Sequence, residues 1–221
     1  MITDQFVYNS FFFSYIFLFG LSLITFIEAM RTKSMKIRHI LNLETAVSLI
    51  AGFVYSILVT KLDKKEISLD DITNYRYMDW FITTPLLLLV LILFYNYRDK
   101  KPIYFSIYLL IIIINYCMLY SGYLGENNKN IKYKACIIGF VFYSLLIYII
   151  WYNFLSIEAS YVDIILFITF ATIWGLYGIV YLIQNIKLKN ICYNILDIIA
   201  KVFFGIFMWV YYGNIFDIEK A

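Results

Sequence analysis

The sequence contains seven apolar runs, each 21 to 25 residues long, and these constrain the fold more than any other feature. They are 6–28, 40–62, 75–97, 103–123, 135–155, 161–183 and 191–215. About 20 apolar residues in a helix span the hydrocarbon core of a bilayer, which is about 30 Å thick. The links between the runs are too short to hold a soluble domain. We therefore predict an all-α membrane protein, with residues 1–221 forming a single domain, a bundle of seven transmembrane helices.

Composition agrees with a lipid bilayer as the surroundings. Hydrophobic residues make up 63% of the chain and charged residues 15%, whereas soluble domains carry about 25% charged residues. The net charge of +3 gives no reason to expect nucleic acid as a partner. Cys117, Cys136 and Cys192 lie in or beside apolar runs without paired spacing, so we interpret them as packing residues and expect no metal site.

Basic residues between the first two runs indicate the orientation. This link carries Arg31, Lys33, Lys36 and Arg38. Because short cytoplasmic loops are enriched in lysine and arginine, we expect the N-terminus outside and the C-terminus in the cytoplasm. Links on the other side also contain lysines, so this expectation rests on the first link.

A lysine within the last run is the main functional signal. Lys201 lies ten residues after Ile191, which places it roughly 15 Å into the membrane, where an ionisable group indicates a functional site. Asp197 lies one turn earlier, and the third run carries Arg76 and Asp79. A buried amine near carboxylates can form a structural ion pair, bind an ion or condense with an aldehyde to form a Schiff base. A charged Schiff base would need a nearby anion, which Asp79 or Asp197 can supply.

Aromatic residues on the sixth run could line a ligand site. Trp174, Tyr177 and Tyr181 recur at spacings of three and four, which places them on one side of a helix. Such a stripe can wall a flat, conjugated ligand. Taken alone, the same stripe would more often be ordinary packing.

Two segments resemble one known family. Residues 76–89 read Arg-Tyr-Met-Asp-Trp-Phe-Ile-Thr-Thr-Pro-Leu-Leu-Leu-Leu, and residues 196–205 read Leu-Asp-Ile-Ile-Ala-Lys-Val-Phe-Phe-Gly. They are similar to the third and seventh helices of microbial (type 1) rhodopsins, whose helix count also matches. The resemblance implies all-trans-retinal bound as a Schiff base to Lys201, with Asp79 as counterion and proton acceptor, Asp197 as second counterion and Arg76 as an arginine gate.

The same resemblance assigns the surroundings of the ligand. It implies that Thr83 hydrogen-bonds to Asp79 and that Tyr55 holds the second counterion. The side chains that it places along the polyene are Trp80, Leu87, Trp174, Tyr177 and Tyr181. Proteorhodopsins that absorb green light carry leucine at the position of Leu87, so we expect green absorption.

The chain also departs from the bacterial pumps of that family. Val90 occupies the position of their cytoplasmic proton donor. Gly178 occupies the position at which many relatives have a proline in the sixth helix. We expect Glu44 to act as a substitute donor or as a gate; the alternative is a glutamate that reaches headgroup water. Its small size, together with Val90 and Glu44, makes the chain most similar to the rhodopsins of large DNA viruses that infect protists.

These features favour an ion transporter rather than an enzyme. The leading hypothesis is a light-driven outward proton pump. A light-gated cation channel is the alternative, since the usual donor is missing and Ser10, Ser14 and Glu44 are polar positions on the first two runs. A sensory photoreceptor and a seven-helix transporter or receptor without retinal remain open. The expected partners are the bilayer, protons or small cations and, as is common in this family, further copies of the same chain.

Overall fold

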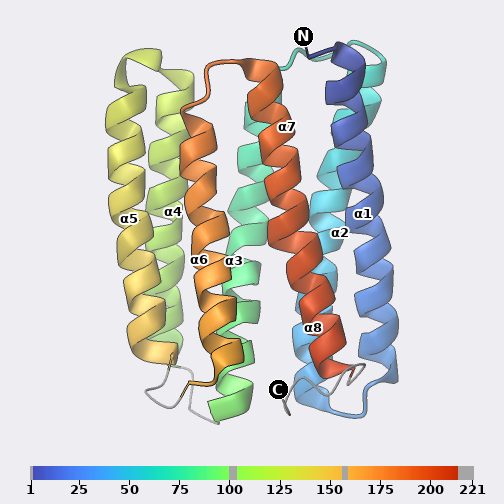
Figure 1. Cartoon of the computed structure of the whole chain (residues 1–221), viewed down its shortest axis with the longest axis vertical. Coiled ribbons are helices and arrows are strands. Elements are labelled where there is room, and N and C mark those ends of the chain that lie inside the picture. Colours follow the sequence, from blue (N-terminus) through green and yellow to red (C-terminus); the bar gives the residue numbers. More distant parts are fainter. Residues whose placement is uncertain (1, 100–103, 156–158, 214–221) are drawn as a thin grey trace.

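The computed structural model describes residues 2–99, 104–155 and 159–213, and within them the chain forms seven helical rods (Figure 1). The first six rods are α1 Asp4–Arg31, α2 Met35–Asp63, α3 Ile72–Asp99, α4 Phe105–Asn127, α5 Lys132–Phe154 and α6 Tyr161–Tyr181. The seventh consists of α7 Ile186–Asp197, a π-helical turn η2 Ile198–Phe203, and α8 Phe204–Tyr212. A short 3-10 turn, η1 Lys129–Ile131, precedes α5. All seven rods are long and apolar enough to cross a membrane, which confirms the predicted fold class.

Side-chain caps determine where several helices begin. The Thr3 side chain accepts a hydrogen bond from the first turn of α1, and Ser34 does the same for α2. Ser160 and Asp163 form a reciprocal capping box at the start of α6, and Asn185 accepts two backbone N–H groups at the start of α7. Because each cap satisfies N–H groups that lack a partner within the helix, these residues fix the points at which the chain re-enters the bundle.

Predicted and observed helix ends differ by a few residues. The sixth predicted run, 161–183, extends beyond α6, since Leu182 and Ile183 form a tighter turn bonded three residues back. The fifth predicted run, 135–155, ends one residue beyond α5. Residue 103 of the fourth run and residues 214–215 of the seventh lie outside the described residues.

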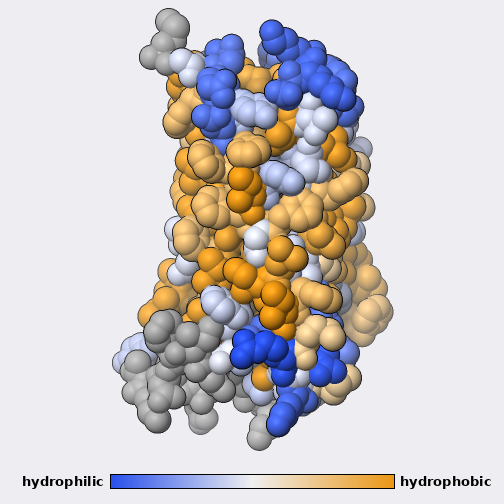
Figure 2. Space-filling model, turned by 90° about the vertical axis from the view of Figure 1, so that its right-hand side faces the viewer, coloured by the Kyte–Doolittle hydropathy of each residue, from blue (hydrophilic) through white to orange (hydrophobic). Residues whose placement is uncertain are grey.

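The third and seventh rods form the centre of the bundle. In their most apolar windows 61% of residues are buried, against 17% in α4 and α5. The face in Figure 2 shows apolar side chains between hydrophilic groups at the two ends. The outer helices therefore present an apolar surface to lipid, while α3 and the last rod can hold polar groups away from it.

Two irregularities lie in these central rods. Pro85 lies inside α3, and the Tyr108 hydroxyl donates to its carbonyl at 3.1 Å. The π-helical turn η2 contains Lys201. Such single π turns are frequent at functional sites, because they locally widen the helix and redirect side chains.

Candidate functional site

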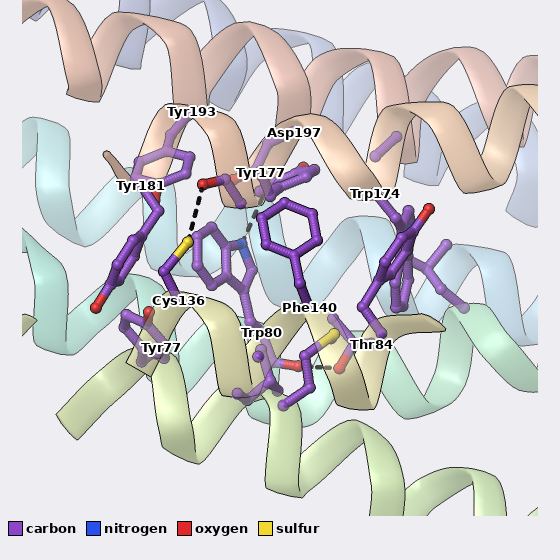
Figure 3. A pocket seen from close by; sticks show the side chains of 18 of the residues that line it. Tyr77, Trp80, Thr84, Cys136, Phe140, Trp174, Tyr177, Tyr181, Tyr193 and Asp197 are labelled. Atoms are coloured by element: carbon purple, nitrogen blue, oxygen red, sulfur yellow. Dashed lines mark hydrogen bonds between the residues drawn. The ribbon is translucent and has the colours of Figure 1, made fainter. Parts of the chain in front are cut away.

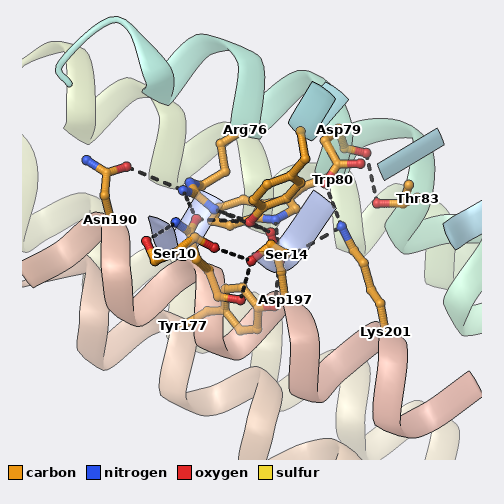
Figure 4. A network of polar contacts seen from close by, with 12 residues as sticks. Ser10, Ser14, Arg76, Asp79, Trp80, Thr83, Tyr177, Asn190, Asp197 and Lys201 are labelled. Carbon is orange, nitrogen blue, oxygen red and sulfur yellow. Dashed lines mark hydrogen bonds and ion pairs between the residues drawn. The ribbon is translucent and has the colours of Figure 1, made fainter. Parts of the chain in front are cut away.

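The Lys201 amine lies between two carboxylates at the centre of the bundle (Figure 4). Its Nζ is 2.5 Å from Asp79 Oδ2 and 3.9 Å from Asp197 Oδ1. Lys201 and Asp79 are each 1% exposed, and Asp197 is fully buried. The structure thus brings together three residues that the sequence places on two separate runs.

The Asp197 carboxylate is surrounded by hydrogen-bond donors. Tyr55 of α2 donates to Oδ2 at 2.6 Å, and Arg76 of α3 lies 3.3 Å from the same oxygen. Tyr177 of α6 and Trp80 of α3 donate to Oδ1 at 2.7 and 3.2 Å. The Tyr55 contact was expected from the resemblance. The sequence did not reveal the bonds from Tyr177 and Trp80, which were expected only to line the ligand.

The Asp79 carboxylate has far fewer partners. Oδ2 contacts Lys201, whereas Oδ1 has no hydrogen-bond partner among the described residues. Thr83 does bond to Asp79, but its hydroxyl donates to the backbone carbonyl at 2.9 Å and not to the carboxylate. A threonine inside a helix commonly bonds the carbonyl four residues back, and this explains the choice of atom.

Arg76 is held by neutral oxygens as well as by Asp197. Its guanidinium donates to Asn194 Oδ1 at 2.9 Å, to Asn190 Oδ1 at 3.3 Å and to the Tyr55 hydroxyl at 3.1 Å. Among the described residues its ion pair is with Asp197. Neither asparagine was identified from the sequence, because an uncharged polar residue in an apolar run is a weaker sign of a functional site than an ionisable one. Asn190, Asn194 and Asp197 follow one another at spacings of four and three, and this helical spacing could have identified the two asparagines from the sequence.

An apolar cavity extends from Lys201 between α3, α4, α5, α6 and the last rod (Figure 3). Its lining includes all five side chains predicted along the polyene: Trp80, Leu87, Trp174, Tyr177 and Tyr181. It also includes residues of α4 and α5 that the sequence did not distinguish, among them Met118, Leu119, Gly122, Cys136, Gly139, Phe140 and Tyr143.

Tyr55 was expected among the ligand-binding residues, but the structure places it behind Asp197. Tyr55 does not line the cavity. Its hydroxyl donates to Asp197 Oδ2, whereas Tyr177 and Trp80 donate to Oδ1. Tyr55 is therefore connected to the cavity through Asp197, which lines it.

Gly178 allows α5 and α6 to approach closely at the cavity. A Cβ atom at this position would lie 2.5 Å from the Phe140 ring, closer than van der Waals contact permits. The absence of a side chain thus allows Phe140 to form part of the wall.

The cavity fits a conjugated aldehyde such as retinal. Its walls are aromatic and aliphatic, and a buried amine lies at one end with a carboxylate 2.5 Å away. An apolar wall suits a polyene, the amine can form the covalent link, and the carboxylate can balance a positive charge on the nitrogen.

Glu44 lies on the other side of Lys201 from Arg76. It is fully buried, and neither carboxyl oxygen has a hydrogen-bond partner among the described residues. It packs against Gly205, one turn beyond Lys201: a Cβ atom at Gly205 would lie 2.6 Å from Glu44 Oε1. This burial contradicts the alternative in which Glu44 reaches headgroup water. Val90, at the position of the usual donor, is also fully buried.

The chain matches one family over nearly its whole length. The family described as "Bacteriorhodopsin-like protein" matches residues 6–215. A green-light absorbing proteorhodopsin from Gamma-proteobacterium EBAC31A08 is 26% identical over 156 residues, which span 63% of this chain and 61% of that relative, less than two thirds of its length.

Solved structures show the same fold. The crystal structure of viral rhodopsin OLPVRII is 39% identical, with a TM-score of 0.89, and the match covers 95% of this chain and 99% of that one. The proton pumping rhodopsin AR2 from the marine alga Acetabularia acetabulum is 20% identical, with a TM-score of 0.80 and 97% of each chain covered.

These findings confirm the resemblance seen in the sequence, including the similarity to viral rhodopsins. The family binds retinal through a Schiff base to a lysine, and its members are light-driven transporters or photoreceptors. The seven apolar helices fit an integral, multi-pass membrane protein. The chain belongs to the bacteriorhodopsin-like family of microbial rhodopsins.

Proposed function

We propose that this protein is a light-driven outward proton pump that carries all-trans-retinal on Lys201, with its N-terminal end facing outward. The observation that carries the proposal is the 2.5 Å contact between the Lys201 amine and the Asp79 carboxylate. When bound, retinal supplies the light-driven isomerisation that changes the position and proton affinity of the nitrogen. The side chains around it then determine where the proton goes.

Asp79 is the better proton acceptor of the two carboxylates. Asp197 receives hydrogen bonds from Tyr55, Tyr177, Trp80 and Arg76, all of which stabilise its charged form. Asp79 has one oxygen without a partner among the described residues, and so gains most from taking a proton. The asymmetry favours transfer to Asp79 while Asp197 stays charged.

Arg76 separates this site from the N-terminal end of the bundle. Its guanidinium lies beside Asp197 and is buried, with 4% of its surface exposed. A fixed positive charge opposes the passage of other cations and stabilises negative charge on the carboxylates. This arrangement supports the role of gate on the outward side.

Glu44 is the proposed proton donor or gate on the cytoplasmic side. The aliphatic Val90 cannot supply a proton, whereas Glu44 lies beside Gly205, one turn beyond Lys201. A buried carboxyl group without hydrogen-bond partners favours its neutral, protonated form. Glu44 can therefore hold the proton that restores the site.

A light-gated cation channel is the second candidate. It is favoured by the apolar Val90 at the donor position and by the polar contacts of Ser10 and Ser14 along α1. A pump is preferred because the acceptor and the second counterion are both present beside Lys201. The sensory role and assembly with further copies of the chain stay predictions.

Illumination of cells that express the protein with all-trans-retinal tests the proposal. The medium should become more acidic in light, and a protonophore should abolish the change. Lys201→Ala should lack both the visible absorption band and the acidification, because among the described residues no other amine lines the cavity. A Lys201→Ala protein that retained the band would overturn the covalent assignment.

A further inference from the structure

Asn194 connects four parts of the bundle through one buried amide. It lies on α7, three residues before Asp197, and is fully buried. Its Nδ2 donates to Ser10 Oγ of α1 at 2.8 Å. Its Oδ1 accepts from the Arg76 guanidinium of α3 at 2.9 Å. The Tyr55 hydroxyl of α2, whose proton is donated to Asp197, lies 3.1 Å from the same oxygen.

The neighbouring groups of α1 are fixed in turn (Figure 4). Ser10 donates to the backbone carbonyl of Val7 at 2.6 Å, which leaves its oxygen free to accept from Asn194. Ser14 donates to the backbone carbonyl of Ser10 at 2.9 Å, and its hydroxyl oxygen lies 3.4 Å from the backbone carbonyl of Asn194. The Asn194 amide is thus tied to α1 on one side and to Arg76 on the other.

We propose that Asn194 is a positioning residue that holds the Arg76 guanidinium beside Asp197 and near Lys201. This inference rests on the proposed function, in which the charge of Arg76 acts on the proton acceptor. Of the four acceptors around Arg76, the Asn194 amide oxygen is the nearest, at 2.9 Å. A neutral amide is required because it must donate to Ser10 and accept from Arg76 at the same time.

A second, small cavity lies beside Arg76. It lies toward the N-terminal end of the bundle, and its lining includes Arg76, Glu126, Lys189 and Asn190. In the structure Glu126 is paired with Lys189. This cavity has room for only about one water molecule, so a guanidinium freed from Asn194 can turn toward the Glu126 carboxylate, away from Asp79 and Lys201, only when the side chains that line the cavity move apart.

The position of Arg76 affects the proton affinity of the acceptor. Asp79 faces Lys201 of η2 directly, with the charges of Asp197 and Arg76 nearby. The Tyr55 hydroxyl of α2 and the Tyr177 hydroxyl of α6 reach this group through Asp197. Glu44 of α2 lies beside Gly205, one turn beyond Lys201, and α1 contributes the hydroxyls of Ser10 and Ser14. Moving one positive charge away makes it easier to protonate Asp79.

Absorption spectroscopy of the retinal-bound protein tests the inference. Acidification from about pH 8 to about pH 2 should shift the visible band to the red when the counterion is protonated. We expect Asn194→Leu to raise the midpoint of this transition by about one pH unit, a tenfold change in proton affinity. Arg76→Gln should raise it at least as much, and the double variant should not exceed Arg76→Gln, because Asn194 acts through Arg76.

Asn115→Leu is the matched control. Asn115 is also a fully buried asparagine, but its amide bonds to Thr84 at 2.8 Å and does not contact Arg76. Loss of a buried amide should lower the thermal unfolding midpoint of both leucine variants. Only Asn194→Leu should move the spectral transition.

The outcomes separate this inference from the proposed function. A wild-type protein without a visible band would contradict the proposed function itself. A wild-type band combined with an unshifted Asn194→Leu transition, or with shifts that add to those of Arg76→Gln, would overturn the role of Asn194 alone. If Asn194→Leu does not fold, Asn194→Ala, which leaves room for water, is judged by the same criteria.

Discussion

At the scale of single residues, the two carboxylates beside Lys201 differ in how many donors they face. Asp197 is bonded by side chains from α2, α3 and α6, whereas Asp79 has a free oxygen among the described residues. The charged Asp197 carboxylate therefore holds three helices together through hydrogen bonds, in addition to its electrostatic effect on Lys201. Asp79 is left free to change its protonation.

Asp79→Asn should abolish outward proton transport while the protein still binds retinal. The amide has nearly the same size as the carboxylate but cannot accept the proton, and loss of a positioned acceptor costs about 10²–10⁴-fold in rate. Light-induced acidification, normalised to the visible absorbance, measures the effect. Asp79→Glu, which keeps an acceptor, serves as the control. Undiminished transport by Asp79→Asn would show that the acceptor lies elsewhere.

Glu44→Gln should slow the recovery of the site after a flash by about 10²-fold, since it removes the proposed donor without changing the packing. The decay of the transient absorbance change measures this recovery. A permeant weak acid added to the buffer should speed the recovery of Glu44→Gln more than that of the wild type. Recovery of the variant at the wild-type rate would assign Glu44 a structural role.

At the scale of the helices, close contact between α1, α2 and α8 depends on Gly205. A Cβ atom there would lie 2.5 Å from Leu21 and 2.6 Å from Glu44. Overpacking of this kind costs about 1–3 kcal/mol. We therefore expect Gly205→Ala to lower the thermal unfolding midpoint and to slow recovery of the site by displacing Glu44.

Gly20→Ala of α1 is the matched comparison for this variant. A Cβ atom at Gly20 has no neighbour within 4 Å, and alanine is favoured over glycine inside a helix by about 1 kcal/mol. Its unfolding midpoint should stay the same or rise. Equal loss of stability in both variants would contradict the packing argument.

Hydropathy predicts the helices well and the site only in part. A bilayer permits few polar residues in a spanning helix, so Lys201, Asp79 and Asp197 stand out against their surroundings. Phe140 and Met118 do not, because an apolar residue that lines a cavity looks like one that faces lipid. The atoms that meet, such as the Thr83 hydroxyl and the Asp79 backbone carbonyl, depend on side-chain rotamers and helix contacts that no periodicity encodes.

At the scale of the whole molecule, polar groups on both sides of Lys201 form an interrupted path along the bundle. Arg76, Asn190 and Asn194 lie toward the N-terminal end, and Glu44 lies beyond Lys201 in the other direction. A pump needs access to alternate between the two sides, whereas a channel needs both sides to be open together. The direction of ion flow against a gradient separates these two modes.

The photocurrent across a membrane, recorded while voltage and proton gradient are varied, tests the central claim most directly. The proposed pump predicts a current that stays outward on both sides of the proton equilibrium potential and disappears in Lys201→Ala. A current that reversed sign at the equilibrium potential of protons or of another cation would contradict the pump and establish a light-gated channel.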